Sequence, residues 1–240
     1  MIGPIFRRGA RTRDEAEKPF WISYSDLMTA LMVLFLVVMG VALLAATRPV
    51  LEKERHAEQR ELEIDHCMDE LAKTARNEFP GVQIEKVTRT VSFGDRARFN
   101  FDSASLAMEQ KVNLQQFVPK VLDLARLPCG KRWLKRVIVE GFTDDRGTYL
   151  YNLNLSLRRS ESVLCALLEE GTSLSEEQRD QVRDLFLVGG YSSNSARESA
   201  EASRRIELRL EFRPLDEQAV VPRGEQRASD IGQCAARGAT

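Results

Sequence analysis

The longest apolar stretch of the chain runs from Phe20 to Ala46, and its only ionisable side chains are Tyr24 and Asp26. As an α-helix rising about 1.5 Å per residue, this stretch is roughly 40 Å long, and it can cross a bilayer with a hydrocarbon core of about 30 Å. A cleaved signal peptide is the alternative, but its apolar core usually has about 7–15 residues. The pattern therefore predicts an uncleaved transmembrane helix over residues 20–46, preceded by a short polar tail over residues 1–19.

A charge-rich segment follows the apolar stretch. From Val50 to Glu78 it contains neither glycine nor proline, and Pro80 and Gly81 then end it. The segment predicts a charged linker helix over residues 47–78 that continues the transmembrane helix. Its apolar side chains recur at helical spacing, at Ile64, Cys67, Met68, Leu71 and Ala75.

Residues 79–213 alternate between strand-like and helix-like patterns. Their order is β-α-β-α-β-β, which predicts an α+β domain with two helices on one face of a mixed sheet. Pro119 should bend the first helix or mark its late start. Residues 214–240 show no period and are expected to form a tail. The expected strands are 82–93, 135–141, 185–191 and 205–212, and the expected helices are 114–125 and 156–169.

The composition narrows the classes of function. The 240 residues include 35 basic and 36 acidic side chains, so the net charge of −1 gives no basic field for nucleic acid. The sequence contains no GxGxxG, P-loop or HExxH pattern, and both histidines, His56 and His66, lie in the charged linker. We therefore expect no enzyme activity, no metal site and no bound cofactor.

The cysteines all follow the apolar stretch, at Cys67, Cys129, Cys165 and Cys234. An even number of cysteines fits an oxidising compartment such as the periplasm, and three connectivities exist if all of them pair. Isolated thiols on helix faces are the alternative. Basic residues slightly favour the segment before the helix, which predicts an inner-membrane protein with a cytoplasmic N-terminus and a periplasmic domain.

Asp26 is an acid inside the predicted membrane helix. An ionised carboxylate in a bilayer costs about 2.5–3.5 kcal/mol even on the lenient insertion scale, so such a residue usually faces a hydrated path lined by protein. There it can take up an ion on one side and release it on the other, with Tyr24 and Thr29 as candidate supporting residues. An acid that only reaches the headgroups is the alternative. A proton is the expected ion and sodium is the alternative, because hydroxyl groups lie nearby at Ser23, Ser25 and Thr29.

The spacing of Trp21, Tyr24, Asp26, Met28 and Thr29 resembles the membrane signature of MotB-like stator subunits. In that family a single transmembrane helix carries the ion-binding aspartate, which implies this role for Asp26. The fuller run DEAEKPFWISYSDLMTALMVLFLVVM at residues 14–39 resembles, more narrowly, the ZorB family, the MotB-like component of the Zorya anti-phage defence system.

A second motif, VEGFTDDRGTYLYNLNLSLRRSESVLCALL at residues 139–168, is similar to the peptidoglycan-binding core of OmpA-like domains. The resemblance implies that Asp144 and Arg159 hold the diaminopimelate of the stem peptide, whose ammonium and carboxylate groups suit an acid and an arginine. Tyr151, Asn152 and Leu155 are expected to line the same site. An Asp–Arg pair that only fixes the loop is the alternative.

Two further segments, FNFDSASL at 99–106 and EASRRIELRL at 201–210, agree with the OmpA-like family. The chain also departs from that family. Phe142 stands where His or Tyr is common, Ser160 replaces a small Ala, and Ser203 replaces the usual Asn. The loop at 191–200 lacks the usual proline.

Together the resemblances imply a homodimer that forms the axle of an ion-driven rotary motor, surrounded by a ring of MotA-like subunits (ZorA in the Zorya system) and anchored to peptidoglycan. Physical reasoning also calls for a partner, because a single helix cannot enclose an ion path around Asp26. A stiff linker helix would transmit torque. The alternatives are a flagellar stator subunit, a purely structural wall anchor, and a TolR- or ExbD-like transducer, which lacks the motif at 143–159.

Overall fold

The computed structural model describes residues 18–169, 171–217 and 234, with side chains from residue 24 onward. The predicted N-terminal tail up to residue 17 and most of the predicted C-terminal tail lie outside the described residues. The chain divides into two compact units, the first ending at His56 and the second beginning at Ala57.

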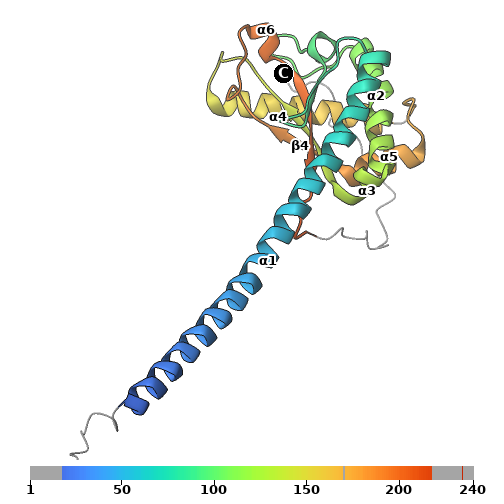
Figure 1. Ribbon diagram of the computed structural model, residues 1–240. Coiled ribbons are helices and arrows are strands. Elements are labelled where there is room, and N and C mark those ends of the chain that lie inside the picture. The colour runs from blue at the N-terminus through green and yellow to red at the C-terminus, as the bar shows by residue number, and fades with distance from the viewer. Residues whose placement is uncertain (1–17, 170, 218–233, 235–240) are drawn as a thin grey trace, which may run out of the picture. The chain divides into compact units, whose positions relative to one another are not determined.

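The first unit contains the start of helix α1, Lys18–Glu78 (Figure 1). The helix continues through Pro49, and every side chain from Tyr24 to Gln59 is exposed. Among the described helices, α1 is the one long and apolar enough to cross a membrane, with a mean hydropathy of 2.8 over 18 residues. A helix that is apolar on all sides and uncovered by its own chain is stabilised by lipid or by partner helices.

The second unit is built on a mixed sheet. In the described part of the chain the sheet has five strands in the order β1-β2-β5-β3-β4. β3 and β4 are parallel, and the other neighbouring strands are antiparallel. The strands are β1 Gln83–Glu85, β2 Thr90–Ser92, β3 Leu134–Gly141, β4 Phe186–Gly190 and β5 Ile206–Phe212.

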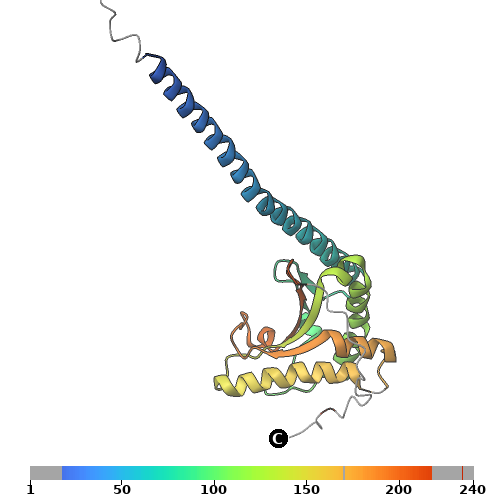
Figure 2. The same ribbon diagram turned by 90° about the horizontal axis from the view of Figure 1, so that it is seen from below.

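Helices pack against this sheet. Helix α4 lies along β3 and β4 in both views (Figures 1 and 2). Val137 and Val139 of β3 share one core with Leu114 and Phe117 of α2. The helices are η2 Gly94–Ala97, α2 Met108–Arg126, α3 Pro128–Trp133, α4 Tyr149–Leu168, α5 Glu176–Leu185 and α6 Ala200–Ser203.

Residues 57–78 of α1 belong to the core of the second unit. Ile64 and Cys67 are fully buried, and Cys67 forms a disulfide with Cys129 of α3, with their Cα atoms 6.2 Å apart. A second disulfide joins Cys165 of α4 to Cys234. The compact unit therefore begins before the domain boundary predicted at residue 79, because the apolar stripe of the linker helix packs into the domain.

The α+β fold class is confirmed, and the structure corrects three of its expected elements. The segment 82–93 is two strands, β1 and β2, joined by a turn in which Arg89 has a φ of 55°. Helix α2 already begins at Met108, so Pro119 lies inside the helix and does not mark its start.

The second expected helix begins earlier than residue 156. Helix α4 starts at Tyr149, because the side chain of Thr148 caps it by accepting the main-chain N–H of Tyr151. Helices α3 and α5 are additional to the expected elements. The early start of α4 places the motif residues Tyr151, Asn152 and Leu155 on a helix.

Candidate functional site

Asp26 lies on α1 in the first unit, and its side chain is exposed. The hydroxyl group of Thr29 donates a hydrogen bond to the main-chain carbonyl of Asp26 at 2.9 Å, so it is engaged with the helix backbone. The side chain of Tyr24 is also exposed. A single chain therefore leaves the Asp26 carboxylate uncovered.

The loop between β3 and α4 carries Asp144. The main-chain N–H groups of Phe142 and Thr143 donate to carbonyl oxygens at 3.1 and 3.0 Å, which fixes the start of the loop. Gly141 allows α4 to pack closely on β3, because a Cβ atom there would lie 2.0 Å from the carbonyl oxygen of Ser156. Gly141 is the last residue of β3, so this close approach lies where the loop leaves the sheet.

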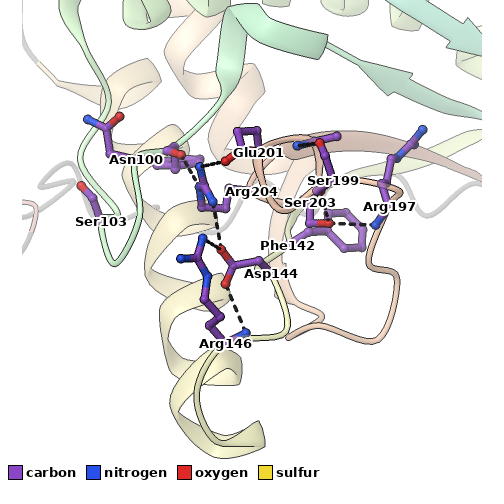
Figure 3. A network of polar contacts seen from close by, with 12 residues as sticks. Asn100, Ser103, Phe142, Asp144, Arg146, Arg197, Ser199, Glu201, Ser203 and Arg204 are labelled. Carbon is purple, nitrogen blue, oxygen red and sulfur yellow. Dashed lines mark hydrogen bonds and ion pairs between the residues drawn. The ribbon is translucent and has the colours of Figure 1, made fainter.

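The carboxylate of Asp144 is buried among arginines (Figure 3). It accepts hydrogen bonds from Nη1 of Arg204 at 2.9 Å, from Nη2 of Arg146 at 3.1 Å and from the main-chain N–H of Arg146 at 3.3 Å. Burial acts to raise the pKa of Asp144, but the hydrogen bonds and charges of Arg204 and Arg146 together hold this pKa below its ordinary value. Asp144 is therefore ionised at neutral pH and suits a cationic ligand.

The Arg159 side chain is fully buried. Its Nη1, Nε and Nη2 atoms donate to the carbonyl oxygens of Phe142, Ser103 and Asn100 at 2.7, 2.9 and 3.2 Å. Desolvation lowers the pKa of Arg159 to about 10, so the guanidinium remains charged at neutral pH. In this arrangement Arg159 ties the loop at residues 100–103 to the end of β3, while Asp144 pairs with other arginines.

The remaining predicted binding residues differ in how exposed their side chains are. Tyr151 is 41% exposed, and its hydroxyl group donates to the carboxylate of Asp102, whereas Asn152 and Leu155 are buried. The structure thus brings Tyr151 and Arg159 to the same loop at residues 100–103.

Arg204 and Arg146 both contact Asp144, and the motif did not single them out. Arg204 donates from Nε to the carbonyl oxygen of Phe99 at 3.1 Å and pairs with Glu201 at 3.4 Å (Figure 3). It is the first arginine of the segment EASRRIELRL, so the sequence did contain a signal for it. Arg146 directly follows the two aspartates of the loop motif.

The departures from the OmpA-like pattern have structural roles. The hydroxyl group of Ser160 donates to the carbonyl oxygen of Gly189 at 2.7 Å, which joins α4 to β4. The hydroxyl group of Ser203 accepts the N–H of Arg197 at 2.8 Å and donates to the carbonyl oxygen of Ser199 at 2.9 Å (Figure 3). Both serines therefore hold the protein's own main chain.

A groove of about 650 Å³ lies on the sheet. Among the described residues that line it, none is a predicted binding residue. Its lining contains the ion pairs of Arg209 with Glu140 at 2.7 Å and of Arg205 with Glu207 at 2.7 Å. These pairs balance the two carboxylates that face each other across β3 and β5.

Comparison with known proteins covers both units. A protein from Escherichia coli described as Zorya protein ZorB is 46% identical over 216 residues, which cover 88% of this chain and 88% of that protein. The chain belongs to the ZorB family. A second ZorB, from another strain of Escherichia coli, is 27% identical and covers 82% of this chain and 90% of that protein.

Two family models match separate parts of this ZorB-family chain. Residues 7–45, which include Asp26, match the family described as membrane MotB of the proton-channel complex MotA/MotB. Residues 98–205 match the OmpA family. A peptidoglycan-associated lipoprotein from Agrobacterium fabrum is 33% identical over 91 residues, which cover 36% of this chain and 44% of that protein. This member of the ZorB family is therefore a membrane-anchored protein that carries an OmpA-like domain.

Proposed function

We propose that this chain is the membrane-anchored subunit of an ion-driven rotary motor used in anti-phage defence. The observation that carries the proposal is Asp26, an exposed acid in an apolar helix, within the segment that matches membrane MotB. Proton transfer at Asp26 changes its contacts with a surrounding ring and drives rotation. A proton is the favoured ion, and sodium is the alternative.

The motor requires partners, because an acid exposed to lipid is costly. A homodimer of this chain inside a ring of MotA-like subunits, ZorA in the Zorya system, would shield Asp26. The exposed apolar surface of α1 between Tyr24 and Ala46 supports such an assembly.

The second unit would anchor the motor to peptidoglycan. Asp144 is ionised and lies in the segment that matches the OmpA family, so it can accept the ammonium group of diaminopimelate. Arg159 supports the site by holding the loop at residues 100–103. No enzymatic step is part of this proposal.

The disulfides support a periplasmic location for the second unit, because such bonds persist in oxidising compartments. The basic residues before the membrane helix support a cytoplasmic N-terminus at the inner membrane.

Asp26→Asn tests the motor, because it removes the titratable group and keeps the shape of the side chain. The variant should copurify with the ring subunit as the wild type does and should give no protection in phage plaque assays. Asp65→Asn is the matched control, because it makes the same chemical change at an exposed aspartate of α1 outside the apolar stretch, and it should protect normally. Full protection by Asp26→Asn would instead favour a purely structural wall anchor.

A further inference from the structure

The two disulfides of the second unit differ in how far the protein encloses them. Cys67 is 0% exposed and Cys129 is 9% exposed, and both belong to the hydrophobic core. Cys165 and Cys234 are half-buried, and the core formed by the described residues does not include them. The second unit therefore contains one enclosed disulfide and one more accessible disulfide.

The packing of α1 against α3 encloses the first of these bonds. Cys67 lies on the buried stripe of α1, one turn from Leu71, which is 2% exposed. Cys129 lies at the start of α3. At the other end of α3, Nε1 of Trp133 donates a hydrogen bond to the carboxylate of Glu63 on α1 at 2.6 Å. Once α1 is docked by these contacts, the sulfur atoms of the first pair lie inside the core.

A protein disulfide forms by exchange with the disulfide of an oxidising protein. A thiolate of the chain attacks one sulfur of the oxidising protein, which gives a mixed disulfide and a thiolate leaving group. A second thiolate of the chain then attacks the chain's own sulfur in the mixed disulfide. The oxidising protein leaves as a dithiol that has gained two electrons, and the two thiols of the chain have lost their protons to solvent. The first attack requires a sulfur that another protein can reach.

We propose that the second unit acquires its disulfides in two steps, by exchange with a protein disulfide. The Cys67–Cys129 bond closes before the core packs around it, and the Cys165–Cys234 bond closes on the folded unit. An oxidising protein must therefore act on this chain while the second unit is still unfolded. This inference rests on the proposed periplasmic location, because disulfides form in oxidising compartments.

The order of the cysteines along the chain agrees with these two steps. The first cysteine pairs with the second, and the third pairs with the fourth. With the N-terminus in the cytoplasm, Cys67 and Cys129 reach the periplasm before Cys165 does. The first bond can close before a later cysteine competes for either thiol. Of the three possible connectivities, the observed one therefore needs no rearrangement of wrong pairs.

Reduction in native buffer tests the difference in enclosure on the oxidised full chain in detergent. Dithiothreitol is added without denaturant, the thiols are alkylated at successive times, and mass spectrometry of the peptides locates the label. Cys165 and Cys234 should be labelled first. Cys67 and Cys129 should be labelled roughly a thousandfold more slowly, because the reductant reaches their bond only when the core opens. In guanidinium chloride both bonds should be reduced at similar rates.

Leu71→Ala and Leu62→Ala form a matched pair of variants on α1. Leu71 is 2% exposed, whereas Leu62 is 63% exposed. Loss of the buried leucine favours opening of the core, so Leu71→Ala should speed the labelling of Cys67 roughly thirtyfold and leave that of Cys165 unchanged. Leu62→Ala should be labelled as the wild type is.

Three results would overturn the proposal. The two bonds could be reduced at the same rate in native buffer, the Cys67–Cys129 bond could be reduced first, or Leu71→Ala could leave the labelling of Cys67 as slow as in the wild type. Each would show that the core does not shield the first bond from exchange.

Alkylation in intact cells separates this inference from the proposed location. New chains are pulse-labelled, and the alkylating reagent is added at successive times before lysis, without reductant. The Cys67–Cys129 bond should appear in new chains before the Cys165–Cys234 bond. If all four cysteines are alkylated at every time, the periplasmic location fails and the two-step order fails with it. If both bonds form but Cys165–Cys234 appears first, only the two-step order fails.

Discussion

Replacing Arg159 with alanine should destabilise the second unit before it affects any ligand contact. The guanidinium makes three hydrogen bonds to main-chain carbonyls from a fully buried position. At about 1.5 kcal/mol for each charge-assisted bond, the low end of the usual range, their loss costs roughly 4.5 kcal/mol. The carbonyls of Asn100, Ser103 and Phe142 would be left without this donor, so the loop at residues 100–103 should loosen.

Guanidinium chloride unfolding measures this loss on the full chain in detergent. Trp133 is 8% exposed and reports on the second unit, and Trp21→Phe in every variant removes the other tryptophan signal. With an m-value of roughly 4 kcal/mol/M, the midpoint of Arg159→Ala should fall by about 1 M. Arg159→Lys should be intermediate, because one ammonium cannot reach three separate carbonyls.

Arg158→Ala is the matched control, because Arg158 is the neighbouring residue on α4 and is exposed. Its stability should stay within about 0.5 kcal/mol of the wild type. If Arg159→Ala unfolds at the wild-type midpoint yet no longer binds peptidoglycan, the reasoning from burial is refuted, and Arg159 acts as a direct ligand contact.

Two further predictions concern pH and the cysteines. The pKa of Asp144 is lower in the folded chain than in the unfolded one, so its contribution to stability is present above about pH 4 and is lost as pH falls through the folded pKa. Asp144→Asn should therefore show a shallower loss of stability between pH 5 and pH 2 in unfolding titrations, and equal slopes would contradict this cause. The double variant Cys67→Ser, Cys129→Ser should lose about 4 kcal/mol, because the disulfide closes a loop between residues 62 apart. The lost free energy of unfolding is obtained by comparing its unfolding midpoint with that of the oxidised wild type. An unchanged midpoint would show that the bond does not constrain the unfolded chain.

The periodic elements of the fold could be predicted from the sequence because their apolar side chains recur on the face that packs into the core. Strand β5 alternates, and Ile206, Leu208 and Leu210 are buried as expected. The apolar stripe from Ile64 to Ala75 was also visible in the sequence, but such a stripe indicates only that this face of the helix packs against another surface. Periodicity could not tell whether its own domain or a partner covers that face.

The short helices were harder to predict because few apolar residues define them. Val182 is the buried residue of α5, too little for a periodic signal. Its capping box was present in the sequence, since Ser175 and Gln178 bond each other's main-chain N–H groups. Local capping chemistry therefore carried information that the hydrophobic pattern did not.

The candidate site could be proposed from its motif, but the contacts that its arginines make could not. The family pattern implied a ligand role for Arg159, whereas the structure buries that side chain against main-chain carbonyls. Partner choice depends on which loops meet in space: Arg204 is 60 positions from Asp144 along the chain and lies 2.9 Å from it in the fold. Asp144 lies in the loop between β3 and α4, and its use in binding remains a prediction.

The packing of residues 57–78 into the second unit determines where this protein can be divided or recombined. A graft that exchanged the OmpA-like domain at Pro80 would remove Ile64, Met68 and Leu71 from the core and would leave Cys129 without Cys67. A junction between His56 and Ala57 keeps every one of these contacts within one donor. Hybrid chains that combine the membrane segment of one family member with the OmpA-like domain of another should therefore be joined there.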